Sequence, residues 1–317
     1  MDKLVLAATS EYPAVWMLPL DGKTGQVTGG LERVTSSNSF DVYPAVSRDG
    51  SKLVFASDRQ RNNNDVYVKD LRSGMETALT TTEFHELAPL LNANGQRVLY
   101  YMWRPDRKPT FSFWQVDTHG GTPRQVCGDC DGSLYCWSND EKKVIYFKAQ
   151  PGKLGNLMVR DLASGSEWVF AVHPKYEVRL PRLSWDERWV VFQTVVSQTQ
   201  RDLYVAAVRD WRAAPEENWI SIPDARAPTA WAPSGNVLYF LSDRDGFRCI
   251  WGQRLDPASK RPMGAAFAMQ HLHTARRSFG PSGEIGAIGL SLAPNQLFFS
   301  MPERIGNVWI AQLEGRP

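Results

Sequence analysis

Charged side chains, many of them arginines, gather in short polar segments that separate apolar stretches. Two examples are SDRQRNNND at 57–65 and SDRDGF at 242–247. A guanidinium can bind a carboxylate through two parallel N–H bonds, so such segments suit a peptide carboxylate, an acidic sugar or an acidic protein segment. The alternative is that they are ordinary solvated charges that pair within their own turns. The residues that we predict to bind a ligand are Asp41, Arg59, His85, Glu86, Arg107, Glu177, Arg179, Arg226, Arg244 and Arg304.

Three of the four cysteines lie close together in the segment VCGDCDGSLYC, as Cys127, Cys130 and Cys136. A C-x2-C pair can bind zinc when two further ligands converge on it. Only one more cysteine and no histidine lie near this pair. A local disulfide or simple thiols therefore fit the segment better than a metal site.

Two histidines alternate in the segment AMQHLHTARRS, as His271 and His273. On a strand, residues two apart share a face, so with a carboxylate the two imidazoles could hold a metal ion. The chain has only five histidines and none of the others is close in sequence. We therefore predict no metal site and no cofactor, with His271, His273, Cys127 and Cys130 as the candidate ligands if that prediction is wrong.

Motifs for catalysis are missing from the sequence. It has no Gly-x-Ser-x-Gly, no His-Glu-x-x-His and no phosphate-binding glycine loop. The string Asp-Arg-Asp-Gly at 243–246 lacks the length and the later glutamate of a calcium loop, so we interpret it as a turn. We predict no catalytic residues.

A repeat of about 40 to 50 residues positions these segments. Its clearest copy is Tyr43–Thr80, with a Ser-x-Asp-Gly turn, an apolar strand, a polar loop and a strand of the type D-h-Y-V-x-D-L. Further copies begin at Ala88, Ser133, Pro181, Pro228 and Ile288. The last strand type occurs seven times, as AVWMLPL, DVYVKDL, FSFWQVD, NLMVRDL, DLYVAAV, CIWGQRL and NVWIAQL.

The repeat predicts an all-β protein, a single β-propeller over residues 1–317. One four-stranded unit cannot bury both of its faces, whereas a ring of such units can. We predict seven four-stranded blades, with six blades and an extra N-terminal hairpin as the alternative, and a ring closed by pairing of the N- and C-terminal strands. The expected repeats are approximately 1–40, 41–86, 87–132, 133–177, 178–227, 228–285 and 286–317.

The charged segments are predicted to share one face of this ring. In an up-and-down blade, the loops between the second and third strands lie on the same side as the connections between blades. We call this side the loop face. Function collects on such loops because the strands are committed to packing.

The string S-x-D-G-x-x-h-x-F-x-S-D-R at Ser47–Arg59, whose second half recurs at Tyr239–Arg244, resembles the WD-type propeller repeats of TolB, the periplasmic component of the Tol-Pal system. It is also similar to the N-terminal propellers of dipeptidyl peptidase IV-type proteins. The resemblance covers nearly the whole chain and implies the fold, but the same repeat serves binding proteins, peptidase domains, lyases and sensors. Some copies lack the Asp-Gly turn, for example at Asp140-Glu141 and Asp186-Glu187.

Composition limits the partners. The chain has 36 basic and 34 acidic residues and a net charge of +2, so we expect no nucleic-acid binding. No run of 18 apolar residues occurs, which predicts no membrane span. We expect a monomer. A periplasmic or extracellular location is expected if the chain is part of a larger exported protein, and a cytoplasmic one if it is complete.

Taken together, the sequence predicts a non-catalytic TolB-like propeller that binds a protein segment or a small acidic ligand at the loop face. It could be a sensor or scaffold module of a larger bacterial protein. The alternative is an enzyme, a metal-dependent polysaccharide lyase or another glycan-active propeller.

Overall fold

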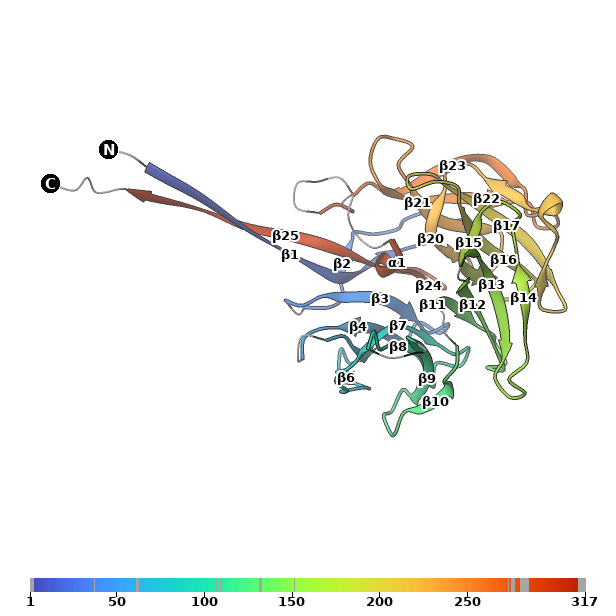
Figure 1. The fold of residues 1–317 in the computed structure, drawn as a ribbon. Coiled ribbons are helices and arrows are strands. Elements are labelled where there is room, and N and C mark those ends of the chain that lie inside the picture. Colours follow the sequence, from blue (N-terminus) through green and yellow to red (C-terminus); the bar gives the residue numbers. More distant parts are fainter. Residues whose placement is uncertain are drawn as a thin grey trace.

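Antiparallel β-sheets make up almost all of the regular structure in the computed structural model (Figure 1). Within the described part of the chain, helix is confined to η1 (Glu216–Asn218) and α1 (Ile285–Ile288), and neither has the length and apolarity needed to cross a membrane. The described residues are 3–36, 38–60, 63–106, 108, 110–130, 133–150, 152–272, 274, 277–279 and 285–312.

Six sheets contain the strands of this described part, five of them four-stranded and one five-stranded. We describe them in chain order, each from its innermost strand outward. The first sheet consists of β3 (Asp41–Val46), β4 (Lys52–Ser57), β5 (Asp65–Asp70) and β6 (Glu76–Ala78), and the second of β7 (His85–Leu91), β8 (Arg97–Trp103), β9 (Phe111–Asp117) and β10 (Arg124–Cys127). The third consists of β11 (Ser133–Trp137), β12 (Lys143–Gln150), β13 (Lys153–Asp161) and β14 (Glu167–Ala171). The others are β15 (Glu177–Leu183), β16 (Trp189–Val195) and β17 (Arg201–Arg209) with β18 (Arg212–Ala213) and β19 (Ile220–Ile222); β20 (Arg226–Trp231), β21 (Val237–Ser242), β22 (Cys249–Leu255) and β23 (Pro262–Gln270); and β24 (Leu290–Ala293), β25 (Gln296–Gln312), β1 (Lys3–Pro19) and β2 (Glu32–Arg33).

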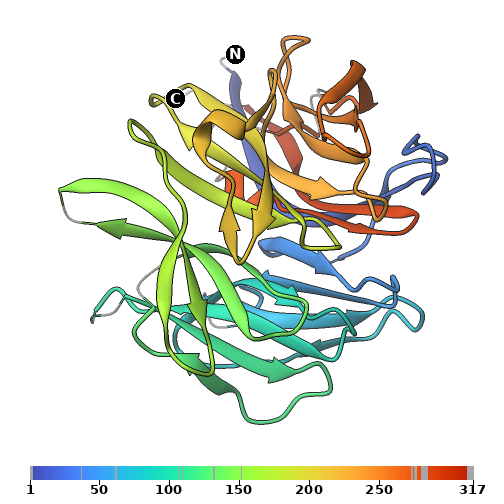
Figure 2. The same ribbon diagram turned by 90° about the vertical axis from the view of Figure 1, so that its right-hand side faces the viewer.

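The sheets are the blades of a propeller. Figure 2, which views the molecule from the side opposite the two termini, shows them following one another around a ring in sequence order. The predicted all-β propeller is confirmed, but the prediction of seven blades was wrong, because the ring has six.

The seventh copy is missing because the two ends of the chain stay extended. The segment AVWMLPL, predicted as a strand of its own copy, continues the 17-residue strand β1, which begins at Lys3. NVWIAQL likewise continues β25, which begins at Gln296. The two strands pair antiparallel from Lys3↔Gln312 to Pro19↔Gln296. Only the half nearest β24 belongs to the blade, and the other half projects from the loop face as a two-stranded ribbon (Figure 1). The predicted pairing of the N- and C-terminal strands does close the ring.

Two prolines mark the place where this ribbon leaves the blade. Pro13 and Pro302 face each other across the pair, directly beside the buried Ala14 and Met301. Proline has no N–H to give to the ladder and is usually excluded from inner strands. Because the two prolines are paired with each other, the missing backbone hydrogen bonds are confined to one position of the strand pair.

The recurrent Ser-x-Asp-Gly motif forms the turn between the first and second strands of a blade. Ser47 Oγ accepts a hydrogen bond from Lys52 N at 2.9 Å, and the same bond recurs in two other blades. Gly50 takes the left-handed conformation with φ of 70°. Glu141 and Glu187 hold the same position with φ of 62° and 57°, so these copies keep the turn at the cost of a conformation that favours glycine. We call this side of the ring the turn face.

Candidate functional site

A cavity of about 190 Å³ lies on the axis of the propeller, bounded by all six innermost strands and by their turns. Its wall combines apolar and aromatic side chains with many polar and charged groups. Representative lining residues, one from each blade, are Arg48, Leu91, Trp137, Arg182, Thr229 and Ser291.

Arg182, on the innermost strand β15, is a partly buried cation in this wall. Its Nη1 donates to Tyr135 O of the preceding blade at 2.8 Å. Burial lowers the pKa of Arg182, which means that the charged guanidinium is poorly solvated. Among the described residues, no carboxylate forms an ion pair with it. The other nitrogens of the guanidinium remain available to an anion.

Arg48 closes the end of the cavity toward the turn face. Its Nη2 reaches from the first turn of the ring to Asn139 Oδ1 at 2.6 Å and to Trp185 O at 3.2 Å, and its guanidinium lies 5.0 Å from the centre of the Trp185 ring. Burial lowers the pKa of Arg48 as well, while nearby Glu187 opposes that shift. The pKa of Glu187 is itself raised, chiefly by burial. The turn face therefore adds a second cation to the cavity.

Thr229 adds a buried hydroxyl to the wall. The side chain is only 2% exposed, and its Oγ1 has no hydrogen-bond partner among the residues that the structure describes. A buried hydroxyl without a partner costs free energy that a ligand could recover. The cavity thus offers two guanidiniums and one hydroxyl among apolar and aromatic side chains.

The predicted residues at the loop face fall into several small groups. Arg59 lies between the fully buried Asp41, with 3.0 Å between Nη2 and Oδ1, and Glu76, and it stacks 4.5 Å from the ring centre of Tyr67. This arrangement joins strands of one blade. It uses the guanidinium for packing within the sheet.

His85 and Glu86 begin the innermost strand of the next blade. His85 Nδ1 accepts a hydrogen bond from Asn64 N at 3.2 Å. Glu86 is fully buried, accepts a hydrogen bond from Thr82 and lies beside Asp65. Burial, together with the Asp65 carboxylate, raises the pKa of Glu86 to about 8. Glu86 and Asp65 therefore form a buried carboxyl pair between two neighbouring blades.

Three arginines approach one another at the loop face. Arg179 pairs with Glu177 at 2.6 Å and Arg226 with Asp243 at 3.2 Å. The pKa of Arg201 is lowered, first by burial and then by the charges of Arg179 and Arg226. Within the described chain, Nε of Arg179 is buried without an acceptor. Sequence reasoning singled out two of these three for the binding set and left Arg201 out of it.

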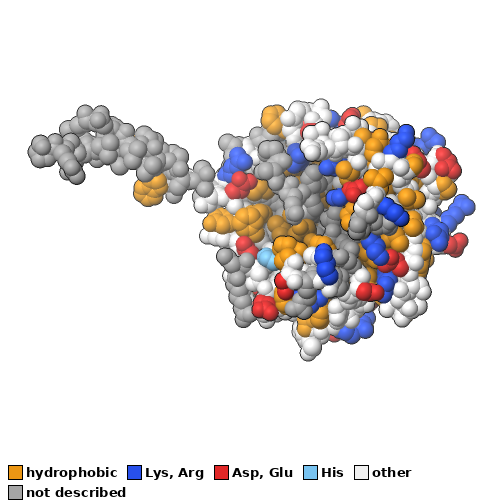
Figure 3. Space-filling view, in the orientation of Figure 1, with side chains coloured by type: hydrophobic (Ala, Val, Ile, Leu, Met, Phe, Trp, Pro, Cys, Tyr) orange, Lys and Arg blue, Asp and Glu red, His pale blue; other side chains and the backbone are white. Residues whose placement is uncertain are grey.

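The remaining predicted loop-face residues make contacts of their own. Arg244 donates from Nη2 to Pro223 O at 2.9 Å, and Arg304 pairs with Glu11 at 3.3 Å at the base of the ribbon. Arg107 lies outside the described residues. Seen from the side, as in Figure 3, the described surface carries interspersed basic and acidic side chains.

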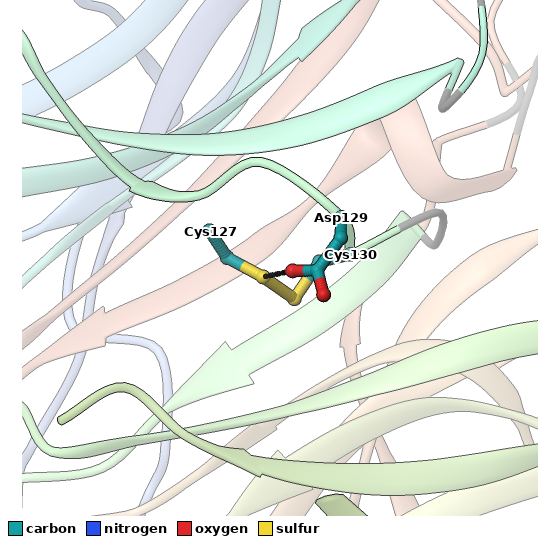
Figure 4. A group of neighbouring side chains, drawn as sticks. All are labelled: Cys127, Asp129 and Cys130. Atoms are coloured by element: carbon teal, nitrogen blue, oxygen red, sulfur yellow. Dashed lines mark hydrogen bonds between the residues drawn. A yellow bond between two sulfur atoms is a disulfide. The ribbon is translucent and has the colours of Figure 1, made fainter. Parts of the chain in front are cut away.

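Of the candidate metal ligands, Cys127 and Cys130 form a disulfide, one of the two alternatives expected for that segment (Figure 4). Asp129 Oδ1 lies 3.2 Å from Cys127 Sγ. His273 lies outside the described residues, whereas His271 meets Asp245, with 2.9 Å between Nδ1 and Oδ2.

Sequence reasoning missed the cavity residues Arg48 and Arg182. Arg48 appears in the sequence as an ordinary residue of a Ser-x-Asp turn, and Arg182 as one residue of an innermost strand. One feature of the sequence could have indicated Arg48. The residue between Ser and Asp of the Ser-x-Asp turn points toward the axis in several blades, as it does for Arg48, Asn139 and Trp185.

Neither a protein-family model nor a curated protein matches the chain. Solved structures do. A protein described as a TolB from Agrobacterium tumefaciens is 17% identical, with 93% of this chain and 99% of that chain covered and a TM-score of 0.67. TolB from Acinetobacter baumannii is 14% identical, with coverages of 76% and 61% and a TM-score of 0.60.

Enzymes share this architecture. An oligogalacturonate lyase in complex with manganese is 11% identical, with 88% of this chain and 81% of the lyase covered and a TM-score of 0.58. Peptidase structures match as well, although the chain covers less than half of them. At these identities the likeness establishes the fold. The chain folds as a six-bladed TolB-like β-propeller.

Proposed function

We propose that the protein is a non-catalytic binding module that holds a small acidic ligand, or the acidic end of a protein segment, in the axial cavity. The observation that carries the proposal is Arg182, a poorly solvated guanidinium with no carboxylate partner in the described part of the chain. A buried charge without a counter-ion is costly, and an anionic ligand would supply the counter-ion.

The size and lining of the cavity support a small ligand. Its volume of about 190 Å³ is below the roughly 300–1,000 Å³ of sites for drug-sized molecules. It could take a monosaccharide acid or the last residue of a peptide. Arg48 supplies a second cation, Thr229 a hydroxyl, and the tryptophans apolar surface for the remainder of the ligand.

The loop-face arginines have a separate place in this proposal. Arg179, Arg201 and Arg226 bring three positive charges together, with Glu177 paired to Arg179 and Asp243 to Arg226. A cationic group of this kind attracts acidic partners from a distance and raises association rates at low salt. In this proposal the three loop-face arginines attract the acidic partner, and Arg182 holds its acidic group once it is bound.

The second candidate is an enzyme that acts on an acidic polysaccharide, and the likeness to the oligogalacturonate lyase is the observation that favours it. The two candidates differ in one respect that is easy to measure. A lyase would turn an oligogalacturonate with added manganese into unsaturated products that absorb ultraviolet light. A binding module would leave it unchanged.

Calorimetric titration tests the proposal with two matched pairs of probes. D-galacturonate is compared with D-galactose, and acetyl-alanyl-alanine with a free carboxylate is compared with its amide. The proposal predicts binding of at least one acid and none of its neutral counterpart. Loss of a charged hydrogen bond, about 1.5–3 kcal/mol, corresponds to roughly 10- to 150-fold weaker binding in Arg182→Gln.

Arg188→Gln is the matched control. Arg188 belongs to the same blade but is exposed on the turn face, where it pairs with Asp186 at 3.1 Å. This variant should bind as the parent protein does. Equal affinity of the parent and Arg182→Gln, or equal binding of acids and neutral analogues, would show that the cavity is not the acid site.

A further inference from the structure

A second cluster of chemically active side chains lies on the blade formed by β20–β23, away from the axial cavity. Asp245 comes from the loop between β21 and β22, Cys249 is the first residue of β22, and His271 follows the last residue of β23. One ligand atom of each residue lies within 4.8 Å of the other two. The β21–β22 connection therefore delivers a carboxylate and a thiol, and the segment after β23 an imidazole, to one point.

We propose that Asp245, Cys249 and His271 bind a divalent zinc ion, with a fourth position open to water or to a ligand. Ligand atoms around a tetrahedral zinc ion are roughly 3.3–3.8 Å apart. The three ligand atoms here all lie within 4.8 Å of one another, and His271 Nδ1 lies 2.9 Å from Asp245 Oδ2, so the side chains would have to shift by up to roughly 1.5 Å to surround the ion. Thiolate, carboxylate and neutral imidazole together balance the charge of the ion. The sulfur ligand favours zinc over manganese or magnesium, which prefer oxygen ligands.

The surroundings of the cluster already orient two of the three side chains. The N–H of Leu272 donates to Cys249 Sγ at 3.4 Å, the kind of contact that stabilises a metal-bound thiolate. Asp245 Oδ2 lies 2.9 Å from His271 Nδ1, and the His271 ring packs edge-on against Trp251 at 6.2 Å. Burial raises the pKa of Cys249, so zinc must displace a proton from the thiol when it binds.

The exposure of the three residues indicates an open site. Cys249 is fully buried, whereas the side chains of Asp245 and His271 are 26% and 50% exposed. A structural zinc site is usually closed by four protein ligands, whereas three ligands and a solvent-facing position leave room for an exogenous ligand. The other three-residue group in the described chain contains Cys127 and Cys130, whose thiols are consumed by their disulfide.

Cobalt titration of the full chain, purified without reductant and freed of metal with a chelator, tests the site. One equivalent of Co²⁺ should give a thiolate charge-transfer band and the visible spectrum of a four-coordinate ion, and Zn²⁺ should abolish both. Cys249→Ser should lose the charge-transfer band. His271→Gln and Asp245→Asn, both at exposed positions, should bind Co²⁺ at least about tenfold more weakly.

Cys136→Ser is the control, because Cys136 is the other free cysteine and is buried on β11. It should bind cobalt like the parent, and circular dichroism of each variant should match the parent spectrum. The proposal is overturned if the parent shows no thiolate band, if the band survives in Cys249→Ser, or if His271→Gln and Asp245→Asn both retain the parent affinity.

Discussion

The carboxyl pair between the first two complete blades should make the stability of the protein depend on pH. Glu86 and Asp65 are both fully buried, and burial together with Asp65 raises the pKa of Glu86 to about 8. In the unfolded chain the pKa of a glutamate is about 4.3. Between these two values the folded protein therefore holds one proton more than the unfolded chain.

The sign and size of the effect follow from this difference. Stability is fully present below about pH 4, falls as the pH rises, and levels off above the folded pKa of Glu86. Each unit of pKa shift corresponds to about 1.4 kcal/mol, so the free energy of unfolding should fall by about 5 kcal/mol across this window. Glu86→Gln removes the titrating group and keeps hydrogen-bonding atoms toward Thr82 and Asp65.

Urea unfolding of the parent and Glu86→Gln at intervals from about pH 5 to pH 9 measures this slope. The parent should lose stability with rising pH, and the variant should show a much flatter profile and be the more stable protein near pH 8. Glu76→Gln is the control. Hydrogen bonds from Arg59 and Lys69 lower the pKa of Glu76, although burial acts in the opposite direction. Glu76→Gln should therefore be less stable than the parent at every pH in this range, and its stability should fall with rising pH as steeply as that of the parent. An unchanged slope in Glu86→Gln would refute the reasoning.

Two further predictions concern closure of the ring and contacts between blades. Deletion of residues 1–9 and 305–317 should leave the thermal unfolding midpoint nearly unchanged, because 13–19 and 296–302 still pair within the closing blade; loss of cooperative unfolding would contradict six-blade closure. Tyr135→Phe should cost about 1–3 kcal/mol in urea unfolding, because the single proton of the buried hydroxyl is shared between two carbonyls of the preceding blade, at 2.7 and 2.8 Å, and the variant removes it. A change below about 0.5 kcal/mol would mean that these contacts do not stabilise the junction.

The fold was predictable from the sequence because the repeat is local. Strand alternation and turn chemistry recur within each copy, and the copies at Tyr43–Thr80 and Pro228 place their strands as expected. The blade count failed because the segment SEYP at 10–13 looks like a loop between two strands. Nothing in it turns the chain, so β1 runs straight through and pairs with an equally straight β25.

The candidate sites were less accessible to sequence reasoning because their residues are far apart in the chain. Arg48 and Trp185 meet across the axis although 137 residues separate them. Asp245 was interpreted as part of a turn, which is correct locally, but its proximity to His271 depends on how the outer strands of the blade end. The period of the repeat predicts which residues share a face, whereas contacts across the ring depend on the blade number and twist.

We propose that Arg182 anchors an acidic group in the axial cavity. A crystal structure of the protein soaked with D-galacturonate, at a concentration that saturates binding in solution, would show where the acid binds. We expect density for the ligand in the cavity, with its carboxylate within hydrogen-bonding distance of the Arg182 guanidinium. Density for the sugar only at the loop face, or an unfilled cavity at saturation, would contradict it.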